Sequence, residues 1–246
     1  MNSNVIYVPK DLSEWKNEER VFILLDRACL ELYEKKDKSL ELLNGIDHPK
    51  KKIEEYCSSH FSEIFSKEEM VLNIRPDILH QCLLSLLDSP LNKSGRLLVY
   101  IRTMSNVLIE VNPQLSVPRS FKEFSSLMVN LLVKRKVLAV NGNTILMKII
   151  KNDIDKILPI GGKKYGLSVN GTQKSIRALA NEIYSGQDSN ARKSAVTFVV
   201  GAVAYGDPIQ SCDFIEEVIS ISSYPLSAAL CCSKICNEFE YLWGIC

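Results

Sequence analysis

A chain of 246 residues, 46% hydrophobic and 24% charged, has the composition of an ordinary globular protein, and one domain over residues 1–246 is expected. No apolar run reaches the length of a membrane span, because Ser, Lys or Gly interrupts the longest ones. The first residues lack a basic region followed by an apolar core, so secretion is not expected. The formal net charge of +1 argues against a uniformly basic surface but allows a local basic face.

The eight cysteines raise the question of disulfides or a metal site. Cys57 and His60 have the spacing of one of the two ligand pairs in a metal site, and Cys232 and Cys236 are four residues apart in a helical pattern. Neither pair has a second half at ligand spacing. Several cysteines lie among Leu, Ala and Ile, where a thiol behaves as a small hydrophobic group. We therefore expect reduced, structural thiols, a reducing compartment and no metal.

The first part of the chain predicts a strand, a helix and a surface insertion. Residues 20–25 are an apolar run typical of a buried strand, and residues 26–33 predict a helix directly after it. Residues from about 34 to 72 are charged and irregular, with helical stretches at 50–57 and 62–70. This composition indicates an insertion at the surface.

A helix and a hairpin follow along the chain. Residues 74–87 predict a helix with Pro76 in its opening turn and Asp77 beside it, and both residue types are favoured at a helix N-terminus. Residues 97–101 and 107–111 are β-rich runs separated by a short polar segment, which predicts a hairpin.

The next predicted helix spans residues 121–136, with apolar side chains on one face. Ser120 and Glu123 have the spacing of a capping box at its start. Residues 161–169 predict a loop followed by a strand.

The C-terminal part predicts a loop, a strand and a helix. The polar residues 181–195 predict the loop, residues 196–200 a buried strand, and residues from Pro225 to about Tyr241 the last helix. Because strands and helices alternate for much of the chain, we expect an α/β fold in which helices cover a sheet.

Two segments near the C-terminus suggest a ligand pocket. The strand over residues 196–200 ends at Gly201, and Gly206 closes the loop after it. The apolar stretch 219–221 leads into a Ser-Ser-Tyr loop before Pro225. Glycines let a backbone approach a ligand, but they also simply permit turns, and the local sequence does not separate these interpretations.

Familiar catalytic and nucleotide-binding motifs are absent. No Lys-Ser/Thr follows Gly206, and no GxGxxG motif joins the first strand to a helix, so a P-loop and a Rossmann site are disfavoured. No Ser-His-Asp or Cys-His pairing can be defended from spacing. Arg75 and Asp77 allow two interpretations: Asp77 serves only the helix terminus, or the pair holds the guanidinium rigid for a phosphate or a base. The local context favours the first.

Four motifs stand in this order along the chain: RPDILHQCLLSLLDSPLN (75–92), VLIEVNP (107–113), VPRSF (117–121) and ISSYPLSAAL (221–230). They resemble the Nep (nucleolar essential protein) family of SPOUT-class methyltransferases, which methylate N1 of a pseudouridine in small-subunit ribosomal RNA. The resemblance runs from about Arg20 to Cys246 and is weakest across 34–72 and 170–195. The eukaryotic branch fits best.

The resemblance implies a SPOUT-type sheet flanked by helices, with the C-terminal part threaded into a trefoil knot. It also implies a homodimer that binds S-adenosylmethionine in the knot and releases S-adenosylhomocysteine. A role in small-subunit ribosome biogenesis, in the nucleus and nucleolus beside pre-ribosomal proteins, follows from the same resemblance.

The family's cofactor contacts match the strand-and-loop segments near the C-terminus. By resemblance, the cofactor-binding residues are Leu167, Gly201, Gly206, Ile219, Ser220, Ile221, Ser222, Ser223, Tyr224 and, beside them, Leu226. Ser223 stands where the family usually has Asn. A backbone contact would survive that change, whereas a side-chain contact would weaken.

For RNA, the resemblance implies contacts by Arg75, supported by Asp77, and by Arg119 at the start of a helix. Two neighbouring positions that are often Arg in the family are Ser116 and Glu123 here. Each lost arginine removes a phosphate contact and lowers the salt dependence of RNA binding. The residues that could compensate are Lys93, Arg102 and Lys122.

The implied reaction is direct attack of the pseudouridine N1 on the sulfonium methyl group of the donor, after the base leaves its stack. The proton on N1 must be lost, and Asp88 is the candidate to orient the base or accept that proton. A turn or cap before Ser89 and Pro90 is the other interpretation of Asp88. The alternative function is an rRNA-binding assembly factor with weak or dispensable methyl transfer.

Overall fold

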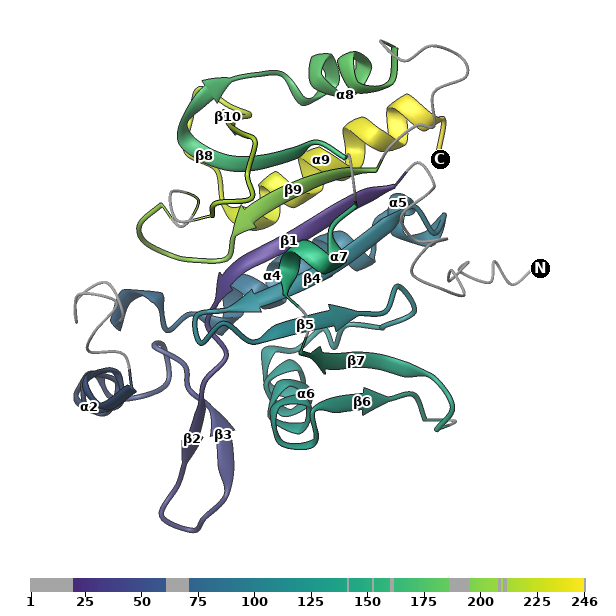
Figure 1. Ribbon diagram of the computed structural model, residues 1–246. Helices are drawn as coiled ribbons and strands as arrows, with labels where there is room; N and C mark the ends of the chain where they lie inside the picture. The colour runs from purple at the N-terminus through teal and green to yellow at the C-terminus, as the bar shows by residue number, and fades with distance from the viewer. Residues whose placement is uncertain are drawn as a thin grey trace.

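A computed structural model describes residues 20–60, 71–140, 142–151, 153–159, 162–185, 195–207, 209 and 212–245. Their main sheet has eight strands: β1 (Val21–Ala28), β4 (Leu97–Thr103), β5 (Leu108–Val111), β6 (Lys136–Leu138), β7 (Ile145–Ile150), β8 (Lys164–Gln173), β9 (Val196–Gly201) and β10 (Glu217–Ser220). The strand order is β10-β8-β9-β1-β4-β5-β7-β6, so β1 and β4 lie at the centre (Figure 1).

The sheet has a parallel half and an antiparallel half. Strands β10, β8, β9, β1 and β4 run parallel to one another. The sheet continues from β4 through β5, β7 and β6, in which each strand is antiparallel to the one before it. Along β1, Val21, Ile23 and Leu25 enter one hydrophobic core. Phe22 and Leu24 enter a second core on the other face. Both faces are therefore covered, which explains why β1 has a continuous apolar sequence rather than an alternating one.

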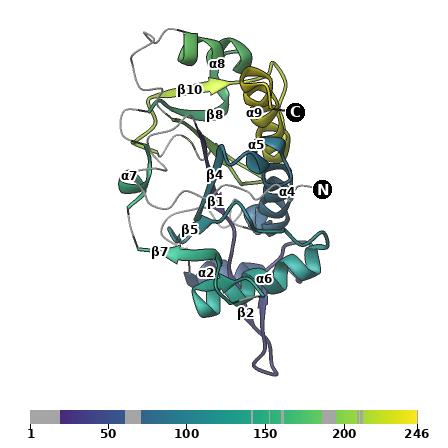
Figure 2. The ribbon, with the colours of Figure 1, turned by 90° about the vertical axis from the view of Figure 1, so that its right-hand side faces the viewer.

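Helices lie on both faces of the main sheet and beside the hairpin of β2 (Leu32–Glu34) and β3 (Leu40–Leu42). They are α2 (Lys50–His60), α4 (Pro76–Leu87), α5 (Pro90–Lys93), α6 (Phe121–Lys134), α7 (Ile154–Ile157), α8 (Ile176–Ser185) and α9 (Ala228–Trp243). Helices α4 and α9 pack against each other on one face, and α7 lies on the opposite face (Figure 2). None of the helices in the described ranges combines the length and the apolar character needed to cross a bilayer.

Several predicted elements are confirmed together with their local causes. Helix α4 begins with Pro76, preceded by Arg75 as N-cap, and carries Asp77 in its first turn. The hairpin is β4 paired antiparallel with β5. Helix α6 begins after Ser120, whose Oγ accepts a hydrogen bond from the Glu123 N–H (3.3 Å) and donates one to the Glu123 carboxylate (2.8 Å).

One predicted element is wrong, and two others differ from the structure in their bounds. Residues 26–33 are not a helix, because β1 continues to Ala28, where Asp26 pairs with Gly201 of β9, and β2 (Leu32–Glu34) follows. Residues 181–185 belong to α8 rather than to a loop, and the rest of that predicted loop up to residue 194 lies outside the described residues. Helix α9 begins at Ala228 instead of Pro225, since Ser227 acts as its N-cap.

The charged region over 34–72 contains the hairpin of β2 and β3 (Leu40–Leu42) and the helix α2. The hairpin extends away from the main sheet, and α2 lies beside it (Figure 1). A small separate core holds this region together, with Cys29, Leu43, Ile53, Cys57 and Ile74 as its buried members. The predicted helical stretch over 62–70 lies outside the described residues.

Candidate functional site

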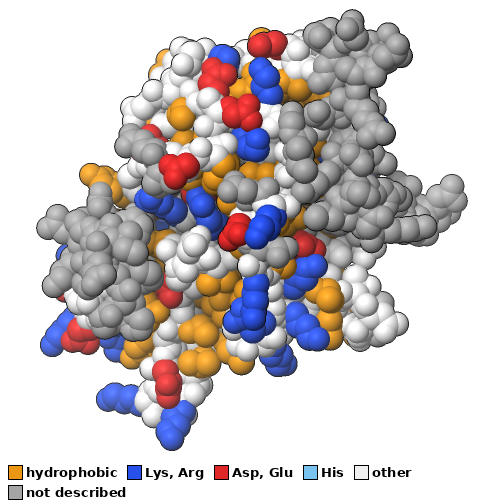
Figure 3. Space-filling model, in the orientation of Figure 1, with side chains coloured by type: hydrophobic (Ala, Val, Ile, Leu, Met, Phe, Trp, Pro, Cys, Tyr) orange, Lys and Arg blue, Asp and Glu red, His pale blue; other side chains and the backbone are white. Residues whose placement is uncertain are grey.

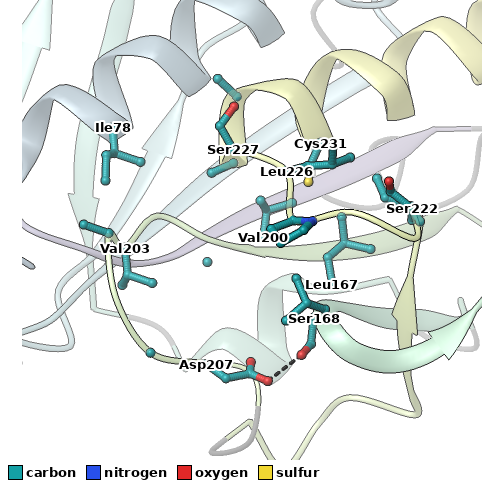
Figure 4. A pocket seen from close by; sticks show the side chains of 18 of the residues that line it. Ile78, Leu167, Ser168, Val200, Val203, Asp207, Ser222, Leu226, Ser227 and Cys231 are labelled. Atoms are coloured by element: carbon teal, nitrogen blue, oxygen red, sulfur yellow. Dashed lines mark hydrogen bonds between the residues drawn. The ribbon is translucent and has the colours of Figure 1, made fainter.

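A cavity of about 620 Å³ lies where the carboxyl ends of β9 and β10 meet the N-terminal ends of α4 and α9 (Figure 4). In α/β sheets, ligands bind outside the carboxyl ends of parallel strands, so this is the expected place for a site. The volume is within the range of about 300–1,000 Å³ that is typical of small-molecule pockets. Apolar side chains and polar backbone segments share its wall.

Most of the predicted cofactor residues line this cavity. They come from β8, from the end of β9 and the loop after it, and from β10 and the segment that joins it to α9. The lining includes Leu167, Gly201, Gly206, Ile219, Ser220, Ile221, Ser222 and Leu226. Residues that are far apart in the sequence are therefore brought together at one cavity.

Ser223 and Tyr224 are not among the lining residues. The Ser223 Oγ accepts a hydrogen bond from Gln173 Nε2 of β8 (2.7 Å). The Tyr224 side chain is 76% exposed, and its backbone N–H donates to the Ser222 Oγ (3.0 Å). Both residues thus shape the loop from outside, while their neighbours face the cavity.

Gly206 is required for the shape of the loop after β9. Its φ angle is +89°, and a Cβ placed on it would meet no atom within 4 Å. The requirement for glycine is therefore conformational, because L-residues rarely adopt this φ angle. Since the same turn borders the cavity, the turn and pocket interpretations of this glycine are compatible.

Two polar residues of the cavity wall were missed by the sequence analysis. Asp207 accepts a close hydrogen bond from the Ser168 hydroxyl, and both lie across the cavity from Ser227 in Figure 4. The second Asp207 oxygen accepts a hydrogen bond from the Ile209 N–H (3.3 Å). The local signal was a carboxylate directly after Gly206, whereas its hydrogen bond with Ser168, 39 residues away, has no counterpart in the sequence pattern.

Arg75 and Asp77 form the mouth of the cavity at the start of α4. Arg75 Nε and Nη2 donate to the two carboxylate oxygens of Asp77, at 2.8 and 2.7 Å. This hydrogen bonding raises the pKa of Arg75 above its ordinary value. The Arg75 side chain is 39% exposed. The structure therefore shows the pair that the resemblance implied, and not the helix-terminus role alone that the local context favoured; the pair holds a cation rigid at the rim.

A buried ion pair lies behind the loop that follows β9. The Asp26 side chain has no exposed surface and receives hydrogen bonds from Arg102 Nε (2.5 Å) and Nη2 (2.9 Å). The Cys212 thiol donates to the same carboxylate (3.3 Å), and burial raises its pKa to about 11. The backbone oxygen of Asp26 accepts from the Ala202 N–H (2.7 Å). Arg102 is thus engaged in the protein interior, and the prediction that it could contact RNA is not supported.

Asp88 and Arg119 lie at the other end of α4, away from the cavity. Asp88 is the C-cap residue of this helix of 12 residues, so roughly 18 Å separates it from the Arg75 end. Its carboxylate forms a close ion pair with Arg119, and both side chains are largely exposed. The structure therefore agrees with the cap interpretation of Asp88 and does not bring Asp88 or Arg119 into the cavity.

The other positions considered for RNA contacts lie at the surface. Ser116 is exposed, and Glu123 is held by Ser120 at the start of α6. Lys93 and Lys122 are exposed as well.

Figure 3 shows one face of the molecule, on which Lys and Arg side chains are dispersed among acidic and hydrophobic ones. That face does not form a uniformly basic surface.

The described residues contain no group of three or more His, Cys, Asp or Glu side chains that could hold a metal ion. Cys82, Cys232 and Cys236 are buried between α4 and α9, and burial raises the pKa of the Cys236 thiol to about 12. A thiol with such a pKa stays protonated at neutral pH, as expected for a structural cysteine.

Comparison with known proteins gives consistent matches over nearly the whole chain. A family model described as "EMG1/NEP1 methyltransferase" matches residues 23–240. The ribosomal RNA small subunit methyltransferase NEP1 of Drosophila melanogaster is 42% identical over 229 residues, which cover 93% of this chain and 84% of that protein. The protein of the same name from Homo sapiens is 42% identical over 228 residues, covering 92% and 83%.

A solved structure has the same fold. The crystal structure of Archaeoglobus fulgidus Nep1 bound to S-adenosylhomocysteine matches with a TM-score of 0.64 and 22% identity. The match covers 92% of this chain and 99% of that chain. It supports the mixed sheet with flanking helices as the shared architecture.

Proposed function

The chain belongs to the EMG1/NEP1 methyltransferase family, and from this premise we propose that it transfers a methyl group from S-adenosylmethionine to small-subunit ribosomal RNA. The observation that carries the proposal is the cavity at the ends of β9 and β10. The residues expected to bind the cofactor come from separate segments of the sequence, and most of them line this one cavity.

The cavity fits a nucleoside-type ligand with a charged tail. Leu167, Val200 and Leu226 provide apolar surface that excludes water, and the turn at Gly206 presents backbone groups rather than side chains. The Asp207 carboxylate adds a hydrogen-bond acceptor and a negative charge on the wall. When bound, S-adenosylmethionine supplies an electrophilic methyl group. The protein then contributes mainly by holding the acceptor base in line with that group.

The mouth of the cavity is suited to RNA. Arg75, fixed by Asp77, lies at the rim and can hold a phosphate or the edge of a base. A base must leave its stack to reach the cavity, so a loop or single-stranded segment is the expected substrate. Arg119 supports the RNA farther along the surface, beyond the C-terminal end of α4.

The acceptor atom that we propose is N1 of a pseudouridine, because the sequence motifs resemble those of the pseudouridine N1-methyltransferases. Asp88 is not retained as the proton acceptor in this proposal, since it lies outside the cavity and pairs with Arg119. The carboxylates that line the cavity are Asp77 and Asp207.

The remaining family features are also part of the proposal: a trefoil knot, a homodimer, a single domain with an insertion over about 34–72, and action on pre-ribosomes in the nucleolus. In the order β10-β8-β9, the connection from β9 to β10 crosses β8, and the strand order is compatible with the proposed knot. Helix α9 then returns to pack on β9 and α4.

Methyl transfer to matched RNA hairpins tests the proposed reaction. The purified full chain is incubated with S-adenosylmethionine and a hairpin that carries one pseudouridine, or with the same hairpin carrying uridine. We expect methylation of the first alone, because N1 of uridine forms the glycosidic bond. Equal methylation of both would reject N1 as the acceptor.

Calorimetry with S-adenosylhomocysteine separates the remaining outcomes. Cofactor binding without methylation of either hairpin would favour the assembly-factor alternative. Absence of cofactor binding would reject the proposal that the chain is a methyltransferase.

A further inference from the structure

Asn73 makes an unusual set of contacts with the loop that follows β9. Its Oδ1 accepts hydrogen bonds from the backbone N–H groups of Ala204 and Tyr205, both at 2.9 Å. Its Nδ2 donates to the backbone oxygen of Tyr205 (3.1 Å). Asn73 is only 8% exposed. One side-chain amide thus satisfies three backbone groups that lie 131 or 132 residues away in the sequence.

The loop needs such support because it has little packing of its own. Ala204, Tyr205 and Gly206 are exposed, and Gly206 has the positive φ angle that closes the turn. The start of the loop is fixed by the hydrogen bond from Ala202 to Asp26. Between that anchor and Gly206, the described hydrogen bonds of the loop backbone go to Asn73.

The loop is also a wall of the cavity. Val203, Ala204 and Gly206 line it. A backbone that recognises a ligand must be held in one conformation before the ligand arrives, since otherwise only a fraction of the molecules is competent to bind. The position of Asn73 therefore matters for ligand affinity even though Asn73 is not itself a lining residue.

Backbone hydrogen bonds hold the segment around Asn73 in place, independently of the contacts of the Asn73 side chain. Its carbonyl oxygen accepts from the Arg75 N–H (2.8 Å), and the next residue, Ile74, accepts from the Gly45 N–H (2.7 Å). The same segment leads directly into the Arg75–Asp77 pair at the rim. The side chain of Asn73 can consequently be changed without removing the anchors of the Arg75 segment.

We propose that Asn73 is a positioning residue for the cofactor: its side-chain amide fixes the loop between Gly201 and Gly206 in the conformation that binds S-adenosylmethionine. The inference rests on the proposed function, because it assigns the cavity to that cofactor. It adds a residue that reaches the cofactor only through the backbone of another segment.

The test compares Asn73→Ala with Asn73→Asp, using S-adenosylhomocysteine as the probe. Alanine removes all three hydrogen bonds, and we expect the Kd measured by calorimetry to rise about tenfold, the equivalent of about 1.4 kcal/mol. Aspartate keeps an acceptor for both N–H groups, but its second oxygen faces the Tyr205 oxygen to which the amide donated, so we expect a loss of affinity for this variant as well.

Asn112→Ala is the matched control. The Asn112 side chain also bonds to backbone groups, since its Oδ1 accepts from the Gln114 N–H (2.9 Å) and its Nδ2 donates to the Ile145 oxygen (3.0 Å). It does not line the cavity. We expect the Asn112→Ala variant to bind S-adenosylhomocysteine with the affinity of the wild type.

Two further measurements separate positioning from general destabilisation. Hydrogen–deuterium exchange should rise in the peptide that covers residues 202–207 of Asn73→Ala, and elsewhere remain as in the wild type. Binding of the pseudouridine hairpin without cofactor should stay within about twofold, because the Arg75 segment keeps its backbone anchors.

The outcomes distinguish this inference from the proposed function. If the wild type fails to bind S-adenosylhomocysteine, the proposed function falls first. If the wild type binds and Asn73→Ala binds equally well, the positioning role of Asn73 is wrong. Exchange that rises throughout Asn73→Ala, or an equal loss of affinity in Asn112→Ala, would likewise overturn it.

Discussion

The wall of the cavity and the surface assigned to RNA are built by different physical means. The wall assigned to the cofactor consists of loop backbone. Its shape depends on two residues behind it that are buried or nearly buried: Asp26, through its backbone oxygen, and Asn73, through its side-chain amide. The surface assigned to RNA carries the exposed or half-exposed ion pairs Arg75–Asp77 and Arg119–Asp88. One region is defined by interactions away from water, and the other presents charges to it.

This difference predicts which substitutions matter. A buried hydrogen bond or ion pair leaves an unsatisfied group when one partner is removed, so its loss is expensive and independent of salt. An exposed ion pair contributes little to folding and acts on a charged ligand in a salt-dependent way. Changes behind the cofactor wall should therefore alter stability or cofactor affinity, whereas changes on the RNA surface should alter RNA affinity alone.

The largest expected effect is that of Arg102→Ala. The substitution leaves the fully buried Asp26 carboxylate without its guanidinium partner, which should lower the free energy of unfolding by about 3–5 kcal/mol. Urea denaturation measures it. Arg119→Ala is the control, since its pair with Asp88 is largely exposed and should contribute about 1 kcal/mol or less. Equal losses of unfolding free energy in the two variants would contradict the contrast between the buried pair behind the cavity wall and the exposed pair on the RNA surface.

A smaller effect is expected from Gly206→Ala. The φ angle of +89° is strained for alanine by about 1–3 kcal/mol, so the loop should shift and S-adenosylhomocysteine should bind about tenfold more weakly. Calorimetry measures the Kd. Gly142→Ala serves as the control, because Gly142 also has a positive φ angle (+74°), its Cβ would also meet no atom within 4 Å, and it does not line the cavity. A similar loss of affinity in Gly142→Ala would show that the effect is not local.

The sequence was sufficient for features with a local cause. The apolar run of β1, the start of α4 at Pro76 and the cap at Ser120 each depend on neighbours within a few residues. The grouping of the cofactor residues was predicted as well, although through family motifs rather than through spacing.

The features that were missed depend on contacts between distant segments. Residues 26–28 extend a strand because Asp26 pairs with Gly201 and Arg102, and neither partner is visible in the local pattern. The contacts of Asn73 with Tyr205 and of Ser168 with Asp207 have the same character. No periodicity or motif encodes such contacts, so only the folded structure reveals which polar residues support the cavity.

On the RNA surface, Arg75→Ala should weaken binding of the pseudouridine hairpin by about tenfold and reduce the salt slope by about one unit. Fluorescence anisotropy at several salt concentrations measures both quantities. The Kd for S-adenosylhomocysteine should stay within about twofold of the wild type, because Arg75 is at the mouth of the cavity and the loop anchors are unaffected. Arg75→Lys keeps the charge but loses the two-point pairing with Asp77, so it should recover the salt slope and only part of the affinity. Loss of cofactor binding in Arg75→Ala would contradict the separation of cofactor affinity from RNA affinity.

The smallest and most specific effect concerns Glu123, which combines a helix cap with a negative charge near Arg119. Glutamine can still occupy the capping position, so Glu123→Gln should lower stability by no more than about 0.5–1 kcal/mol, through the lost charge at the helix N-terminus. Removing the carboxylate should also strengthen hairpin binding about two- to fivefold at low salt, and the gain should vanish at high salt because exposed charges are screened. Glu54→Gln, which removes the same charge from the exposed helix α2, should leave hairpin affinity unchanged. If Glu123→Gln gains nothing at low salt, or if Glu54→Gln gains equally, the RNA does not pass along the start of α6, and Arg119 loses its assigned role.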